Sequence, residues 1–137
     1  MLDRVVTGGQ TGADQAGWRA ARAAGIPTGG WMVKGFLTET PDGRGDESHP
    51  EFAALYGACE IPTTRYADRT EAHARDSDST LWFGSTDTSG ARATLGACRR
   101  LERPCLCIVE GWTRPSGWPA GSPRRGSGPG RWRATAS

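Results

Sequence analysis

Three glycines within five residues, Gly8, Gly9 and Gly12, separate two segments of different character near the start of this 137-residue chain. Residues 2–7 have the pattern of a short strand, and residues 13–24 are alanine-rich and predict a helix. Residues 25–27, Gly-Ile-Pro, end that helix, because glycine tolerates the left-handed conformation there and proline cannot continue the helix. The chain therefore begins as a strand, a tight glycine-rich loop and a helix.

The same alternation continues along the chain. The sequence predicts further strands over residues 27–31, 79–83 and 105–109 and further helices over residues 66–75 and 90–101. Residues 34–59 show no clear periodicity, and we interpret them as a long loop across the ligand face with one helical turn at 50–56. Strands that alternate with helices predict a Rossmann-like, three-layer α/β fold with a mostly parallel sheet.

The composition changes at residue 112. Residues 1–111 hold fifteen acidic and twelve basic residues, a net charge of −3, and form the predicted domain. Residues 112–137 hold five arginines and no acid, and thirteen of these twenty-six residues are Gly, Pro or Ser. Such a segment cannot build a core, so we expect a disordered tail and a sheet that lacks its C-terminal strand. We further expect that the residues from about Gly117 onward are translated from a shifted reading frame. The net negative charge of the domain argues against nucleic acid as a partner.

The first glycine-rich loop is the strongest candidate for a ligand site. Its glycines allow the backbone to approach a ligand closely, and the helix that follows directs free N–H groups and a positive dipole end toward it. Thr11 adds a hydroxyl and Gln10 an amide, so a phosphate-bearing ligand is the expected occupant. Asp14 either caps the helix or accepts a hydrogen bond from a sugar or base. The competing interpretation of the loop is a tight turn without a ligand.

A second polar loop, residues 84–90, occupies the equivalent place between the strand at 79–83 and the next helix. It offers hydroxyl groups and a flexible start to the helix, and Arg92 follows in the first turn, where it either pairs with a phosphate or faces solvent. Two such loops at the carboxyl edge of adjacent strands would form the crevice in which open α/β sheets bind ligands. The candidates here are Thr86, Ser89, Gly90 and Arg92.

Other polar and aromatic residues are weaker candidates for a functional site. Asp76 and Asp78 could hold a metal or act as acid and base, but a helix-end turn with solvated acids is the simpler interpretation. Isolated histidines are usually structural or on the surface, and tryptophans that end strands either stack on a base or belong to the core. The histidines are His49 and His73, and the tryptophans are Trp31 and Trp82.

The cysteines and the N-terminus indicate a cytoplasmic protein without a metal site. Cys59, Cys98, Cys105 and Cys107 lack the spacing of a zinc site, and Cys105 and Cys107 alternate along a strand, so free core thiols are expected. There is no signal-peptide pattern and no apolar run of membrane length. We therefore expect no membrane partner, and the sequence is compatible with a homo-oligomer.

Three motifs occur in a fixed order: residues 8–14, GGQTGAD; residues 25–31, GIPTGGW; and residues 75–81, RDSDSTL. The Lys34-Gly35 step, Tyr66 with Arg69-Thr70, and the 91–101 helix before Arg103-Pro104 accompany them. Together they resemble the putative molybdenum carrier family, the circularly permuted YpsA-like branch of the SLOG superfamily, over residues 2 to about 110.

The resemblance implies a Rossmann-like fold related to DprA and to the cytokinin-activating phosphoribohydrolases, with a pocket for nucleotide-derived ligands to which Lys34 would belong. A molybdenum cofactor or molybdate is chemically admissible, because the former carries a phosphate and the latter is a tetrahedral oxyanion. The chain departs from the family where His73 replaces a frequent asparagine, at Ser89-Gly90-Ala91, and in its tail.

Two functions follow. The first is binding of a nucleotide-derived or phosphorylated cofactor without chemistry. The alternative is a hydrolase that cleaves a nucleotide N-glycosidic bond, for which a carboxylate and an arginine must converge on the ribose. The candidates for that pair are Asp14, Glu60, Asp76, Asp78 and Arg92. The glutamate of the hydrolase signature is missing from residues 89–95, which favours binding over catalysis.

Overall fold

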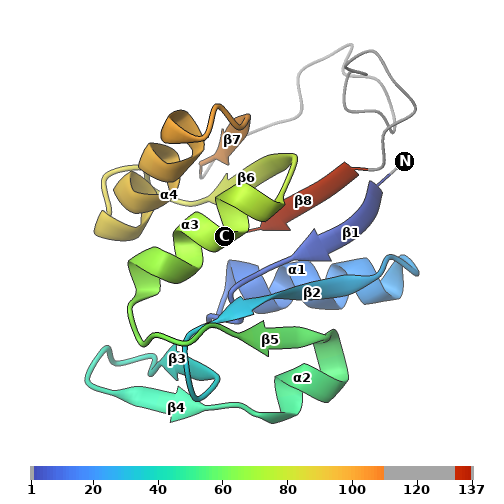
Figure 1. Ribbon diagram of the computed structural model, residues 1–137, viewed down its shortest axis with the longest axis vertical. Coiled ribbons are helices and arrows are strands. Elements are labelled where there is room, and N and C mark those ends of the chain that lie inside the picture. Colours follow the sequence, from blue (N-terminus) through green and yellow to red (C-terminus); the bar gives the residue numbers. More distant parts are fainter. Residues whose placement is uncertain (1, 110–131, 137) are drawn as a thin grey trace.

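The computed structural model describes residues 2–109 together with the backbone of residues 132–136 (Figure 1). Its helices are α1 (Ala13–Ala23), α2 (Glu51–Tyr56), α3 (Tyr66–Asp76) and α4 (Ser89–Arg100). Its strands are β1 (Leu2–Val6), β2 (Thr28–Met32), β3 (Leu37–Glu39), β4 (Asp46–Ser48), β5 (Ala58–Glu60), β6 (Ser79–Phe83), β7 (Cys105–Ile108) and β8 (Trp132–Ala136).

Six strands form one sheet in the order β5-β2-β1-β8-β6-β7, and every pair in it is parallel. Figure 1 shows α1 on one face of this sheet and α3 with α4 on the other. The helices α1, α3 and α4 each begin after the carboxyl end of a strand. The Rossmann-like α/β architecture expected from the sequence is therefore confirmed.

The expectation of a missing C-terminal strand is wrong. Strand β8 lies inside the sheet, where it pairs with β1 on one side and β6 on the other. Its sequence has no apolar periodicity, but two neighbouring strands supply partners for the backbone groups on both of its edges. Most of the tail expected to be disordered, residues 112–131, lies outside the described residues. The expected domain boundary at residue 111 lies outside the described residues.

The first half of the core is built around Trp18 on the inner side of α1. Its indole is fully buried, packs with Met32, Phe52 and Ala58, and donates from Nε1 to the carbonyl of Gly29 at 2.7 Å. Helix α2 adds Tyr56, whose ring stacks on the indole with centroids 4.5 Å apart. This aromatic cluster fixes α1, and with it the loop that precedes α1, against β2.

A second core cluster joins α3 to α4 through Ala74, Ala97 and Cys98. All four cysteines are free, as expected, but Cys59 is exposed and so is not a core thiol. The thiol of Cys98 lies 3.4 Å from the hydroxyl of Thr80 beneath α4. Within the described ranges, no helix is long and apolar enough to span a bilayer.

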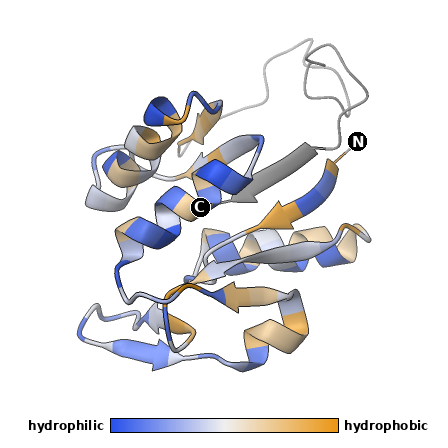
Figure 2. Cartoon of the chain, in the orientation of Figure 1, coloured by the Kyte–Doolittle hydropathy of each residue, from blue (hydrophilic) through white to orange (hydrophobic). Residues whose placement is uncertain are grey.

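The region expected to be one long loop, residues 34–59, contains the antiparallel β3–β4 hairpin, helix α2 and strand β5. Strand β4 is exposed at every residue, and Figure 2 shows it as hydrophilic. A three-residue polar strand has too few side chains to show a periodic pattern, so the sequence did not reveal it. Only the helical turn at 50–56 was predicted correctly.

Candidate functional site

The glycine-rich loop crosses the carboxyl end of β1 and is closed from within by Asp14. One oxygen of this buried carboxylate, Oδ2, accepts the backbone N–H groups of Gly8 and Gln10, each at 3.1 Å. Burial raises the pKa of Asp14 to about 6, although the nearby charge of Arg69 and the two backbone hydrogen bonds lower it. The carboxylate therefore holds the loop in shape and does not face an open ligand space.

The first residues of α1 leave backbone donors unused. In the described part of the chain, the N–H groups of residues 11–14 make no hydrogen bond. Gly12, the N-cap, has φ 91° and no side-chain cap, and a Cβ at this position would meet nothing within 4 Å. Helix α4 differs, because the Thr88 hydroxyl accepts the N–H of Ala91. The α1 terminus is therefore an open anion cradle.

Arg69 of α3 lies directly against this loop, although it was not among the site residues predicted from the sequence. Its Nη1 donates to the carbonyl of Gly8 at 3.3 Å, and its guanidinium would lie 2.6 Å from a Cβ on Gly8. The guanidinium also stacks over the ring of Tyr66 at 5.2 Å, and its Nε is buried without a partner in the described residues. The conjunction of Tyr66 and Arg69 one helical turn apart was the available signal.

His73, one turn further along α3, separates β1 from β2 at their carboxyl ends. The ladder between these strands runs from Val5 N–H to the Pro27 carbonyl and from Thr7 N–H to the Gly29 carbonyl, both at 3.0 Å. The next ladder bond would join Trp31 N–H to the Thr7 carbonyl. Instead, Trp31 N–H donates to Nε2 of His73 at 2.8 Å, and the ring bonds the Thr7 backbone.

Burial lowers the pKa of His73 to about 3, assisted by the charge of Arg69, so the ring is neutral. With Nε2 as acceptor, Nδ1 carries the proton and donates to the Thr7 carbonyl. The neighbouring Gly30 has φ 144°, and a Cβ there would lie 1.9 Å from the Thr7 oxygen. His73 is therefore structural, as a lone histidine usually is, and β2 leaves β1 to continue beside β5.

The β3–β4 hairpin is joined to the loop and to α3 by polar contacts. Oε1 of Gln10 accepts the N–H of Glu39 at 3.0 Å, and the Tyr66 hydroxyl donates to Asp46 at 2.8 Å. Partial burial, together with the Asp46 carboxylate, raises the pKa of Tyr66 to about 12. Gln10 thus faces the hairpin, and the phenol stays protonated at neutral pH.

The second loop follows β6 at the same edge of the sheet, but its strand is not adjacent to β1, because β8 lies between them. The expectation of loops on adjacent strands is therefore wrong. Ser89 and Gly90 are exposed, Thr86 is half-buried, and Arg92 donates to the carbonyl of Asp87 at 2.7 Å. Trp82 lies beneath this loop and donates from Nε1 to the Ser85 carbonyl at 3.1 Å.

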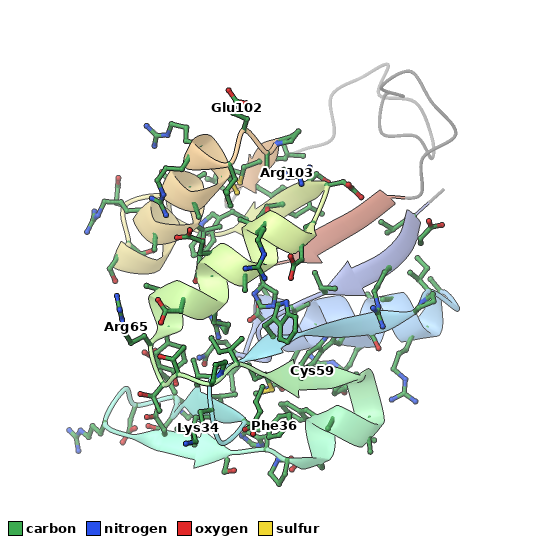
Figure 3. The ribbon with its side chains drawn as sticks, viewed as in Figure 1. Lys34, Phe36, Cys59, Arg65, Glu102 and Arg103 are labelled. Atoms are coloured by element: carbon green, nitrogen blue, oxygen red, sulfur yellow. The ribbon has the colours of Figure 1, made fainter. Side chains whose placement is uncertain are left out.

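The remaining candidate residues do not converge. Lys34 is exposed in the turn after β2, where Figure 3 shows it beside the hairpin. Glu60 accepts the N–H of Gly35 at 2.8 Å. Asp76 accepts the indole N–H of Trp31 at 2.8 Å and pairs with Arg75, which lowers the pKa of its carboxyl. Asp76 and Asp78 precede β6 and so lie at the amino edge, opposite the loops.

His49 lies outside this edge, where its ring stacks on Phe52 with centroids 4.7 Å apart and its Nδ1 lies 3.0 Å from Glu51. A cavity of about 530 Å³ beneath α1 is lined by apolar residues from β1, α1 and β6, including Val5, Leu81 and Phe83. It offers no charge to hold an anion. No group of three or more metal-ligating side chains occurs within residues 2–109.

Comparison with known proteins shows the family of this chain. The model of the circularly permutated YpsA SLOG family matches residues 5–116. A crystal structure of a protein named a putative molybdenum carrier from Syntrophus aciditrophicus SB is similar, with a TM-score of 0.66 and 35% sequence identity. The match covers 79% of this chain and 63% of that one, so the chain spans less than two thirds of that relative. No protein of curated function matches. With most of its length matched by that model, the chain belongs to the circularly permutated YpsA SLOG family.

Proposed function

We propose that this protein binds a small phosphate-bearing ligand of the nucleotide class at the carboxyl edge of its sheet. The phosphate accepts hydrogen bonds from the backbone N–H groups at the start of α1, and Arg69 supplies the positive charge beside it. Of the residues expected from the sequence, Thr11, Gly12 and Asp14 contribute unused backbone N–H groups, and Gly8, Gly9 and Gln10 form the loop that holds them. Thr86, Ser89, Gly90 and Arg92 border the same edge, and Lys34 is not among the groups that we assign to the phosphate.

The observation that carries this proposal is that some N–H groups of the loop are bonded within the loop whereas others are not. Those of Gly8 and Gln10 are held by Asp14, and that of Gly9 by the hydroxyl of Thr7 at 3.3 Å. The N–H groups of residues 11–14 have no acceptor in the described part of the chain, and Gly12 faces open space. Three internal bonds thus fix a loop whose remaining donors suit an external anion.

The second loop borders the same edge, and we assign Thr86, Ser89, Gly90 and Arg92 to the part of the ligand remote from the phosphate. An oxyanion such as molybdate could occupy the cradle alone, and a similar protein is named a putative molybdenum carrier. Two polar loops separated by the width of β8 favour a ligand longer than a single oxyanion. A nucleotide meets that requirement.

The hydrolase alternative gains no support from the arrangement of carboxylates. Asp14 lies inside the loop, Glu60 holds the backbone after β2, and Asp76 lies at the opposite edge. Cleavage of an N-glycosidic bond needs a carboxylate and an arginine at one ribose. We therefore propose binding without chemistry.

The test removes one donor from the cradle. Ala13 is the first helical residue of α1, a position that tolerates proline, and Ala13→Pro deletes one of the unused N–H groups. Ala13→Gly is the control, because it loses the methyl group and keeps the N–H. We expect Ala13→Pro to weaken ADP binding by about tenfold or more and Ala13→Gly by less than about threefold, measured by calorimetry. Equal affinities of the two variants for ADP would contradict the proposal, as would tighter binding of molybdate than of ADP to the unaltered protein.

A further inference from the structure

The parallel pairing between β1 and β2 ends in an unusual way beside the proposed anion site. Backbone bonds of regular spacing join the strands, and the bond that would come next, from Trp31 N–H to the Thr7 carbonyl, is replaced by an imidazole contributed from α3. That bond would extend the pairing beyond Val6, the last residue of β1. Here β2 continues for three residues past its last pairing with β1, and Gly30, Trp31 and Met32 pair with β5 instead. The two strands therefore form a fork with His73 between its branches.

The fork depends on a glycine, Gly30, where β2 separates from β1. Gly30 lies at the branch point with φ 144°, and a Cβ there would overlap the Thr7 carbonyl. Any other residue would push β2 further from β1 or rotate the Thr7 peptide. Glycine at this point and a histidine 43 positions later are therefore two parts of one arrangement.

The branch of the fork on β1 leads directly into the glycine-rich loop. The Thr7 side chain is fully buried, its carbonyl bonds the His73 ring, and its hydroxyl accepts the N–H of Gly9 at 3.3 Å. Fixing the Thr7 peptide thus fixes the first turn of the loop. Arg69, one turn earlier on α3, contacts Gly8 of the same loop.

We propose that His73 is the positioning residue of the anion site: by replacing the last β1–β2 ladder bond, it fixes the Thr7 peptide and, through the Thr7 hydroxyl, the glycine-rich loop. This inference rests on the proposed function for its effect on binding but not for its effect on the loop. An uncharged side chain with one acceptor and one donor is needed in this place. Asparagine is also uncharged and offers one acceptor, its amide oxygen, and a donor, its amide nitrogen.

The experiment compares three variants by backbone amide exchange and by ADP affinity. His73→Leu removes both hydrogen bonds, His73→Asn keeps an acceptor and a donor, and Ala97→Gly weakens α4 without touching the loop. We expect His73→Leu to speed exchange at Gly9 and Trp31 at least tenfold more than at amides of α4. It should weaken ADP binding at least tenfold, whereas His73→Asn should stay within threefold of the parent in both measurements.

Ala97→Gly should instead speed exchange most in α4 and leave ADP affinity unchanged. If His73→Leu does not fold, Thr7→Val provides the decisive comparison, because it removes only the hydroxyl and should speed exchange at Gly9 but not at Trp31. If the exchange rate at Gly9 rises in these variants only as much as the rates elsewhere in the molecule, the positioning role of His73 is overturned. Failure of the parent to bind ADP would overturn the proposed function and leave the exchange comparison intact.

Discussion

Oδ2 of Asp14 accepts the backbone N–H of Gly8 at 3.1 Å, so a carboxylate lies inside the turn that we propose to bind an anion. This relationship explains how a loop with three glycines keeps one shape before a ligand arrives. It also makes the charge of the loop depend on pH.

Asp14 should make the folded protein more stable at acidic pH. Its pKa is raised from 3.8 to about 6 in the folded state, so its contribution is complete below 3.8 and is lost as pH rises through 6. Relative to Asp14→Asn, we expect the parent to lose roughly 3 kcal/mol of unfolding free energy between pH 3.5 and pH 7. Urea unfolding of both proteins at these pH values measures the difference. A constant difference would show that Asp14 has no raised pKa.

His73 should act in the opposite direction. Its pKa is lowered from 6.5 to about 3, so its contribution is complete above 6.5 and is lost as pH falls toward 3, where the unfolded chain binds the proton first. His73→Asn should therefore lose less stability than the parent between pH 7 and pH 4.5, by roughly 2 kcal/mol. Thermal unfolding of both proteins over this range provides the measurement. Parallel pH profiles would mean that the ring is not held neutral.

Gly30 and Gly25 provide a matched pair for the fork. Both have positive φ, but a Cβ on Gly30 would lie 1.9 Å from the Thr7 oxygen, whereas a Cβ on Gly25 would meet nothing within 4 Å. Gly25→Ala should cost only the left-handed strain, about 1–2 kcal/mol. Gly30→Ala should cost more than about 4 kcal/mol or prevent folding. Similar unfolding free energies for the two variants would show that β1 and β2 do not approach this closely.

Arg69 and Arg92 distinguish the two loops. Arg69→Gln removes the cation that lies against Gly8, and we expect ADP affinity to fall by about tenfold or more. Arg92→Gln removes an exposed cation bonded to the Asp87 carbonyl, and its effect should stay below about threefold. Calorimetry at two salt concentrations measures both effects. A larger loss for Arg92→Gln would move the phosphate to the second loop.

Gly9 illustrates why a substitution in this loop needs care. A Cβ there would lie 2.9 Å from the terminal carbon of Met32 and 3.1 Å from Trp18, and Gly9 has φ 77°. Gly9→Val would therefore disturb the aromatic core together with any ligand site. Ala13→Pro avoids that ambiguity, because the altered group is a backbone N–H at the helix start.

The sequence predicted those elements that carry their own local signal. Helix α1 ends where Gly25 and Pro27 end it, and β6 was placed at its observed residues 79–83. Strand β8 was missed because its pairing with β1 and β6 forms it, and sequence separation hides that pairing. The β3–β4 hairpin was missed because each strand has only three residues.

The candidate site was predicted in the same uneven way. The glycine spacing predicted the loop, but no local rule shows that Asp14 would face inward or that Arg69 would reach Gly8 from 61 residues away. The fork depends on three segments, at Thr7, Trp31 and His73, that meet only in the folded chain. Long-range contacts of this kind decide the chemistry of the site and leave no periodic trace in the sequence.

The position of β8 has a consequence for how the protein is made. The sheet consists of a first half, β5-β2-β1, and a second half, β6-β7, and β8 lies between them. On a ribosome, both halves emerge well before residues 132–136, so the sheet stays in two parts with open edges until late in synthesis. Partly synthesised chains with open strand edges are prone to associate with one another. Translation that stalls shortly before β8 should therefore yield a chain that depends on chaperones, even though its ligand loop has already been synthesised.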